Sequence, residues 1–255
     1  QWTPPPRVVN RLEYRADRVG LLSDDWLHLF VVSAEGGVPR QVTHGEFNIG
    51  ARSDGIPSGA TLEWLPDGKS ILVDGNDAAD ADHRFNVSNI YSVDISTGAL
   101  HRLTSDNGYW HAPVLSPDGK WIAFTGFAAS SASYHTSDIY LMHPDGTVLR
   151  LLSSGLDRDP QSLMWADNET LLFTAEDHGT VNIWQVSLTA KGPAIKPVSN
   201  GMHVLSLGSF SQKSGIGVAT RSAPQQPAEI IRFSIKKAWD LQSLTHVNDA
   251  VLAGL

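Results

Sequence analysis

The sequence predicts an all-β fold, a β-propeller of four-stranded antiparallel blades, from three observations. An apolar strand ending in a Pro-Asp-Gly turn occurs twice, and Asp118-Gly119 follows Asp67-Gly68 by 51 residues. A second strand type recurs five times along the chain, and a glycine-containing turn with a short outer strand follows most of its copies. Two hairpins repeated every 45 to 60 residues make one four-stranded blade after another, which is the pattern of a propeller.

The first element of a unit is an inner strand that leads into a tight turn. Its two clear copies are 64–69 and 115–120, and a degenerate copy occupies 165–169. In each clear copy proline presets φ for the second turn position, aspartate suits the third, and glycine closes a type I turn. A short β-rich run follows each turn, so the turn joins the first two strands of a blade.

The second element is a strand with alternating apolar positions. Alternation of this kind is typical of a strand that packs one face into a layer. The steps between successive central residues are 61, 49, 44 and 47 residues. The central residues of the five copies are Phe30, Tyr91, Tyr140, Trp184 and Ile231.

The third element is a glycine-containing turn and a short outer strand, with copies at 36–43, 97–104 and 145–152 and a shorter one at 241–245. Polar residues such as Arg40 and Arg102 alternate with apolar ones, as expected of an exposed edge strand. A β-sandwich also contains many short strands, but it has no reason to repeat the same turn at a fixed period.

The repeats define one domain, a propeller fragment over 1–255 with about five units. We expect these units at about 7–46, 59–108, 109–157, 158–201 and 202–249, the first of them incomplete. The chain opens on Gln1 rather than methionine, so we expect it to begin inside a longer protein.

Composition excludes several classes of function. The net charge of -8 opposes binding to nucleic acid, and no apolar run is long enough for a membrane span. The chain has no cysteine, which excludes disulfides and thiolate chemistry and favours a reducing, cytoplasmic location. Nothing in the sequence calls for a cofactor.

The sequence contains few residue patterns typical of catalytic or metal sites. No serine has glycine at both the second position before it and the second after it, so the G-x-S-x-G nucleophile elbow is missing and we assign no catalytic residue. The ten histidines form no HExxH motif. The best metal candidate is an acidic loop, although an alanine stands at the third ligand position of its calcium-loop pattern and no glutamate closes it. A solvated turn is favoured there over a metal site. The acidic residues are Asp74, Asp77, Asp80 and Asp82.

One charged pair remains as a candidate for substrate gating or peptide binding. Asp157 and Arg158 lie just before the inner strand of a unit. They would anchor a loop at the mouth of the propeller channel or pair with a peptide terminus. The loop-anchoring interpretation is favoured, because ion pairs in loops are common.

The repeats resemble TolB-like and WD-like blades, and three landmarks resemble acylaminoacyl-peptidase-type propellers of the prolyl oligopeptidase family of serine peptidases. The landmarks are 6–17 followed by 28–32, then 155–159, then 244–255. The resemblance implies a seven-bladed ring followed by an α/β-hydrolase domain. This chain supplies about five units and contains no such domain.

Three functions are compatible with this pattern. The resemblance implies a non-catalytic propeller that gates access of peptide substrates to the missing hydrolase domain. The alternative is a stand-alone TolB-like interaction module. A propeller glycosidase is weaker, because most acidic residues lie in turns. A five-unit arc would leave the faces of its terminal blades uncovered. The five units could close on themselves with altered spacing, two chains could cover each other's open faces as a homo-oligomer, or a separate chain could complete the ring. Association is favoured, because the side chains that set the angle between blades in a seven-bladed ring are unchanged.

Overall fold

The computed structural model divides the chain into two compact units, residues 1–111 and 112–255. Sheets in both units are built almost wholly from antiparallel pairs, and the predicted all-β propeller architecture of four-stranded antiparallel blades is confirmed. None of the helices among the described residues has the length and apolar character needed to cross a membrane. The described residues are 5–12, 14–17, 19–22, 25–50, 52–53, 56–57, 61–78, 80–84, 87–104, 108–130, 132, 134–237 and 240–254.

The first unit contains one blade with a divided inner strand. Ile49 lies opposite Gly75 and Glu63 lies opposite Leu72, so two short strands share the same edge of one neighbour. The inner strand is therefore divided, and the chain between its two parts lengthens the first step between repeats to 61 residues. The blade consists of β5 (Asn48–Ile49), β8 (Glu63–Trp64), β9 (Ser70–Asn76), β10 (Asn89–Asp94) and β11 (Leu100–Arg102).

Three two-stranded hairpins lie among the other described residues of this unit. The first repeat is represented by the pairing of Phe30 with Gln41 and of Val31 with Arg40. The apolar residues beside this hairpin, Leu29 and Val42, are buried in the same cluster as Ile49 and Val73. The hairpins are β1 (Arg15–Ala16) with β2 (Gly20–Leu21), β3 (Phe30–Val31) with β4 (Arg40–Gln41), and β6 (Arg52–Ser53) with β7 (Ile56–Pro57).

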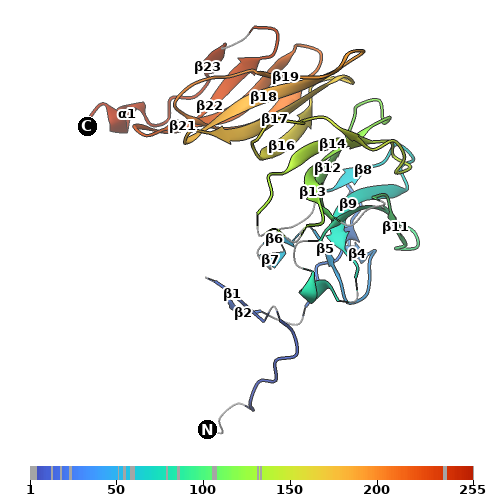
Figure 1. The fold of residues 1–255 in the computed structure, drawn as a ribbon. Coiled ribbons are helices and arrows are strands. Elements are labelled where there is room, and N and C mark those ends of the chain that lie inside the picture. The colour runs from blue at the N-terminus through green and yellow to red at the C-terminus, as the bar shows by residue number, and fades with distance from the viewer. Residues whose placement is uncertain are drawn as a thin grey trace. The chain divides into compact units, whose positions relative to one another are not determined.

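Three blades follow, with the boundary between the two units inside the first strand of the earliest (Figure 1). A single parallel pairing, Val181 with Val204, joins the last two blades into one sheet. A short helix, α1 (Asp249–Leu252), ends the fold. The blades are β12 (Gly108–Leu115), β13 (Ile122–Ala128), β14 (Asp138–Met142) and β15 (Arg150–Leu151); β16 (Pro160–Trp165), β17 (Thr170–Asp177), β18 (Thr180–Thr189) and β19 (Gly192–Pro197); and β20 (Val204–Ser211), β21 (Ile216–Ala223), β22 (Gln226–Ser234) and β23 (Leu241–Ser243).

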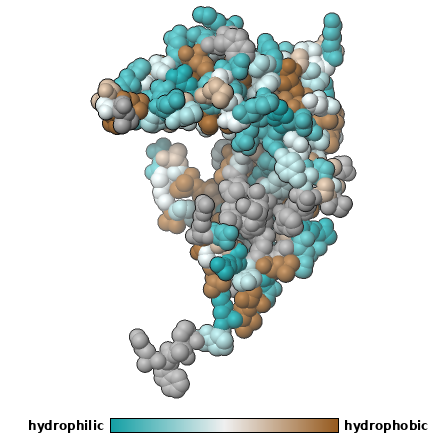
Figure 2. All heavy atoms as spheres, turned by 60° about the vertical axis from the view of Figure 1, so that its left-hand side comes forward, coloured by the Kyte–Doolittle hydropathy of each residue, from teal (hydrophilic) through white to brown (hydrophobic). Residues whose placement is uncertain are grey.

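The central strands of the second unit show which blade faces are covered. Residues 171–175 of β17 are all buried, because apolar clusters pack against both faces of this blade. In β21 burial alternates instead: Ala219 is buried, whereas Val218 is half-buried and Thr220 is exposed. The last blade is therefore buried on one face alone. Figure 2 shows apolar and hydrophilic residues interspersed over the visible surface.

The predicted Pro-Asp-Gly turns occupy matching places in two blades. The Asp67 carboxylate accepts hydrogen bonds from the backbone of Lys69 at 2.8 Å and of Ser70 at 2.9 Å. Asp118 accepts one from the backbone of Lys120 at 3.2 Å. Tyr91 lies opposite Val73 and Tyr140 opposite Phe124, so the two tyrosines hold equivalent positions in their sheets.

A hydroxyl clamp closes the outer hairpin of all five repeats. In each, a Ser or Thr just after the outer strand accepts a hydrogen bond from a backbone N–H in the first half of the third strand or directly before that strand. The same hydroxyl bonds the side chain of the residue before that N–H. The hydroxyl, the N–H residue and the side-chain partner are Thr43, Leu29 and His28; Thr104, Ile90 and Asn89; Ser153, Ile139 and Asp138; Ser199, Ile183 and Asn182; Thr245, Ile230 and Glu229.

Candidate functional site

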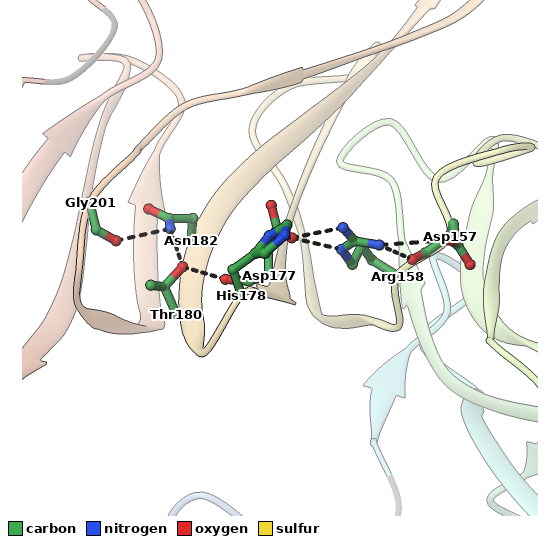
Figure 3. Close-up of polar contacts among 7 residues, drawn as sticks. All are labelled: Asp157, Arg158, Asp177, His178, Thr180, Asn182 and Gly201. Carbon is green, nitrogen blue, oxygen red and sulfur yellow. Dashed lines mark hydrogen bonds and ion pairs between the residues drawn. The ribbon is translucent and has the colours of Figure 1, made fainter.

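The structure places Asp157 and Arg158 in the loop before β16, where the sequence located them. Arg158 bonds chiefly to a third residue: its Nη2 and Nε donate to Oδ1 of Asp177 at 2.7 and 3.1 Å (Figure 3). Its Nη1 donates to the Asp157 backbone oxygen at 2.5 Å, whereas the Asp157 carboxylate is 3.8 Å away and 89% exposed. The guanidinium therefore joins this loop to the β17–β18 hairpin.

Asp177 is the centre of this ion-pair network. The hydrogen bond from Arg158 is the main cause of a lowered pKa at Asp177, and His178, whose Nδ1 lies 2.6 Å from the carboxylate, adds to the effect. Arg158 and Asp177 are each 34% exposed, so solvent screens their attraction. The network therefore fixes the position of the loop and contributes little to the free energy of folding.

Hydrogen bonds continue from Asp177 along the start of β18. The Thr180 hydroxyl donates to the Asp177 backbone oxygen at 2.8 Å, and Asn182 Nδ2 donates to the Thr180 hydroxyl at 3.0 Å. The same amide nitrogen donates to the Gly201 carbonyl at 3.3 Å, and Asn182 Oδ1 accepts from Ser199 at 2.9 Å. Asn182 thus ties the β17–β18 turn to the segment that follows β19 (Figure 3).

This arrangement walls a pocket of about 430 Å³. The neighbouring Arg158 could be found from the sequence, but the pocket could not, because two separate segments without a motif line it. The one available signal was Trp184, an aromatic at the centre of a repeated strand. The lining residues are Asp177, His178, Thr180, Asn182, Trp184, Pro197, Ser199, Asn200, Gly201 and Met202.

The acidic residues of the predicted loop in the first unit lie in different environments. Asp74 is buried on β9, Asp77 accepts a hydrogen bond from the Tyr91 hydroxyl at 2.7 Å, and Asp80 pairs with Arg84 at 2.8 Å. Asp82 belongs to a 3-10 helix, Ala81–His83. Within the described part of the chain, no three His, Cys, Asp or Glu side chains are grouped to hold a metal.

No family model matches the chain. Among curated proteins, the TolB protein of the Tol-Pal system from Francisella tularensis is 28% identical over 144 residues, which is 56% of this chain and 31% of that protein. An uncharacterized peptidase of Bacillus subtilis, YuxL, is 26% identical over 173 residues, 56% of this chain and 24% of that protein. The chain therefore spans about a third or less of these relatives.

Solved structures establish the fold class. The acylaminoacyl peptidase of Pyrococcus horikoshii superposes with a TM-score of 0.62 at 18% identity, over 94% of this chain and 36% of that one. The chain has a β-propeller fold. It resembles both the propeller domains of prolyl oligopeptidase-type peptidases and TolB-like propellers.

Proposed function

We propose that these residues form the propeller of a serine peptidase of the prolyl oligopeptidase family, which gates peptide access to a hydrolase domain elsewhere in the protein. The observation that supports this most is the superposition of 94% of the chain on part of an acylaminoacyl peptidase. The sequence contains no G-x-S-x-G elbow, so the nucleophile of this proposal lies outside the 255 residues. A rigid ring over the active site would exclude large substrates and bulk water.

Within this proposal Asp157 has a more direct part than Arg158. The Arg158 guanidinium is engaged by Asp177, whereas the Asp157 carboxylate is 89% exposed. An exposed carboxylate at a loop is suited to pairing with the amino terminus of a peptide. Arg158 acts in this scheme as the residue that positions the loop.

A second candidate is a TolB-like propeller that acts as a protein-interaction module. The 28% identity to TolB over 144 residues favours it. This candidate predicts no peptidase nucleophile anywhere in the intact protein.

An active-site probe separates the two candidates. A fluorophosphonate, which reacts with activated serines, should label the native protein that contains this segment and leave the 255-residue chain alone unlabelled. Heat-denatured native protein is the control for non-specific reaction. Absence of labelling in the folded native protein would reject the peptidase proposal and favour the TolB-like module.

We also propose that the protein is cytoplasmic. We further propose that the isolated chain associates with a second copy or with the remaining blades. The repeats number about five, fewer than the seven that the family resemblance implies, so neighbouring blades would be missing at the ends. Sedimentation velocity of the 27.6 kDa chain tests this directly. A concentration-independent monomer with no partner chain would contradict the proposal.

A further inference from the structure

Two blades carry an aromatic residue and an aspartate at equivalent positions. Tyr91 lies opposite Val73 on β9, and Trp184 lies opposite Phe173 on β17. Asp77 follows Val73 by four residues, and Asp177 follows Phe173 by four. In the first of these blades the Tyr91 hydroxyl donates to Asp77 at 2.7 Å, so the aromatic donor is satisfied.

The second blade lacks the corresponding hydrogen bond. Asp177 is occupied by Arg158 and His178. The indole Nε1 of Trp184 is buried, and no described residue accepts its proton. Leaving a buried donor unpaired destabilises the folded state. The aromatic side chain therefore has a hydrogen-bond acceptor in the first of these blades and none among the described residues in the second.

Trp184 adjoins a space large enough for a ligand. Trp184 and Asp177 both line the pocket of about 430 Å³, which is within the usual size range of small-molecule sites. Pro197, opposite Trp184 on β19, and Met202, which is 75% exposed, supply apolar surface. Trp184, Pro197 and Met202 give the pocket an apolar part, the remaining lining residues are mostly polar, and the unpaired Nε1 is buried on one of the lining residues.

We propose that this pocket binds a short uncharged peptide segment with an apolar side chain. The side chain packs between Pro197 and Met202, and a backbone carbonyl of the peptide accepts the proton of Trp184 Nε1. Because that nitrogen is covered, binding requires the indole to turn towards the pocket as the peptide enters. The Asp177 carboxylate in the wall disfavours anionic ligands, and its pairing with Arg158 leaves little attraction for cations. This site does not depend on the proposed peptidase function.

The experiment follows the indole N–H signals of the ¹⁵N-tryptophan-labelled chain during titration with N-acetyl-L-leucinamide. The chain has eight tryptophans, and Trp184→Phe assigns the signal of Trp184 by its disappearance. We expect the Trp184 signal to move to lower field and to saturate. N-acetylglycinamide, which has the same amides without the side chain, should bind several-fold more weakly.

Two variants test the two halves of the site. Trp184→Phe keeps an aromatic ring and removes the donor, so calorimetric affinity for N-acetyl-L-leucinamide should fall about tenfold. Met202→Ser changes an exposed residue and should weaken binding several-fold without disturbing the fold. Trp64→Phe, in the first unit, is the matched control and should leave affinity unchanged. A Trp184 signal that stays in place, or unchanged affinity in both pocket variants, would overturn the proposal.

Discussion

The hydroxyl of Ser153 donates a hydrogen bond of 2.6 Å to the Asp138 carboxylate while accepting one of 2.8 Å from the backbone of Ile139. Ser153 is fully buried, and the pair closes the outer hairpin of its blade. The same arrangement recurs in all five repeats, with Asn, Asp, Glu or His as the side-chain partner. The clamp supplies two of the polar contacts that a hairpin end buried between blades requires.

Ser153→Ala should lower the free energy of unfolding by about 1–3 kcal/mol, because it leaves the Ile139 N–H and the Asp138 carboxylate without their partner. Urea denaturation measures the change. Ser214→Ala is the control, since Ser214 is exposed in a turn and should change stability little. Equal effects of the two substitutions would show that the clamp does not stabilise the blade.

Gly98→Ala should destabilise the chain more than Gly36→Ala. Both glycines have positive φ, 74° and 91°, where alanine is strained by about 1–2 kcal/mol. At Gly98 an added Cβ would also lie 2.1 Å from the Val42 carbonyl oxygen, whereas nothing lies within 4 Å at Gly36. Thermal unfolding of the two variants gives the comparison, and similar losses would mean that residues 42–43 move away without cost.

Asp94 should make stability depend on pH at the acidic end. Hydrogen bonds from the Ser96 hydroxyl and the Thr97 backbone lower the pKa of Asp94 from 3.8 to about 2. Because the pKa in the folded state lies below that of the unfolded chain, this stabilisation is fully present well above pH 3.8. It is lost as the pH falls towards 2.

The difference in unfolding free energy between the wild type and Asp94→Asn should therefore be present at pH 6 and should shrink towards zero near pH 2. Urea denaturation across this range measures it. Ser214→Ala, which removes no charge, should give a difference that does not vary with pH. A constant difference for Asp94→Asn would contradict the prediction.

Arg158→Met should raise the pKa of Asp177 towards its ordinary value, because the hydrogen bond from Arg158 is the main cause of the lowered pKa. A carboxyl ¹³C titration measures this. Stability at neutral pH should fall only slightly, since the pair is partly exposed and solvent screens its attraction. Arg84→Met, which breaks an ion pair in the first unit, should leave the Asp177 titration unchanged.

Local sequence determined the repeat and its turns. Asp67 and Asp118 bond the backbone a few residues away, so their turns depend only on neighbours in the chain and could be predicted from Pro-Asp-Gly. The alternating pattern around Tyr91, Tyr140 and Trp184 likewise identified the third strand of each blade. The hydroxyl clamps were present in the sequence as a Ser or Thr after each outer strand, but their partners lie 14 to 16 residues earlier for the N–H bonds.

Tertiary structure alone decided the split inner strand and the candidate site. Ile49 and Glu63 share one strand edge because both pair with β9, which no local pattern encodes. Sequence order favoured Asp157 as the partner of Arg158, yet the guanidinium bonds to Asp177, 19 residues away. The unpaired Trp184 indole could not be predicted from the sequence either. Its surroundings depend on the contact between the β17–β18 turn and the segment after β19. Turns follow from contacts between near neighbours in the chain, whereas a pocket depends on how separate hairpins pack.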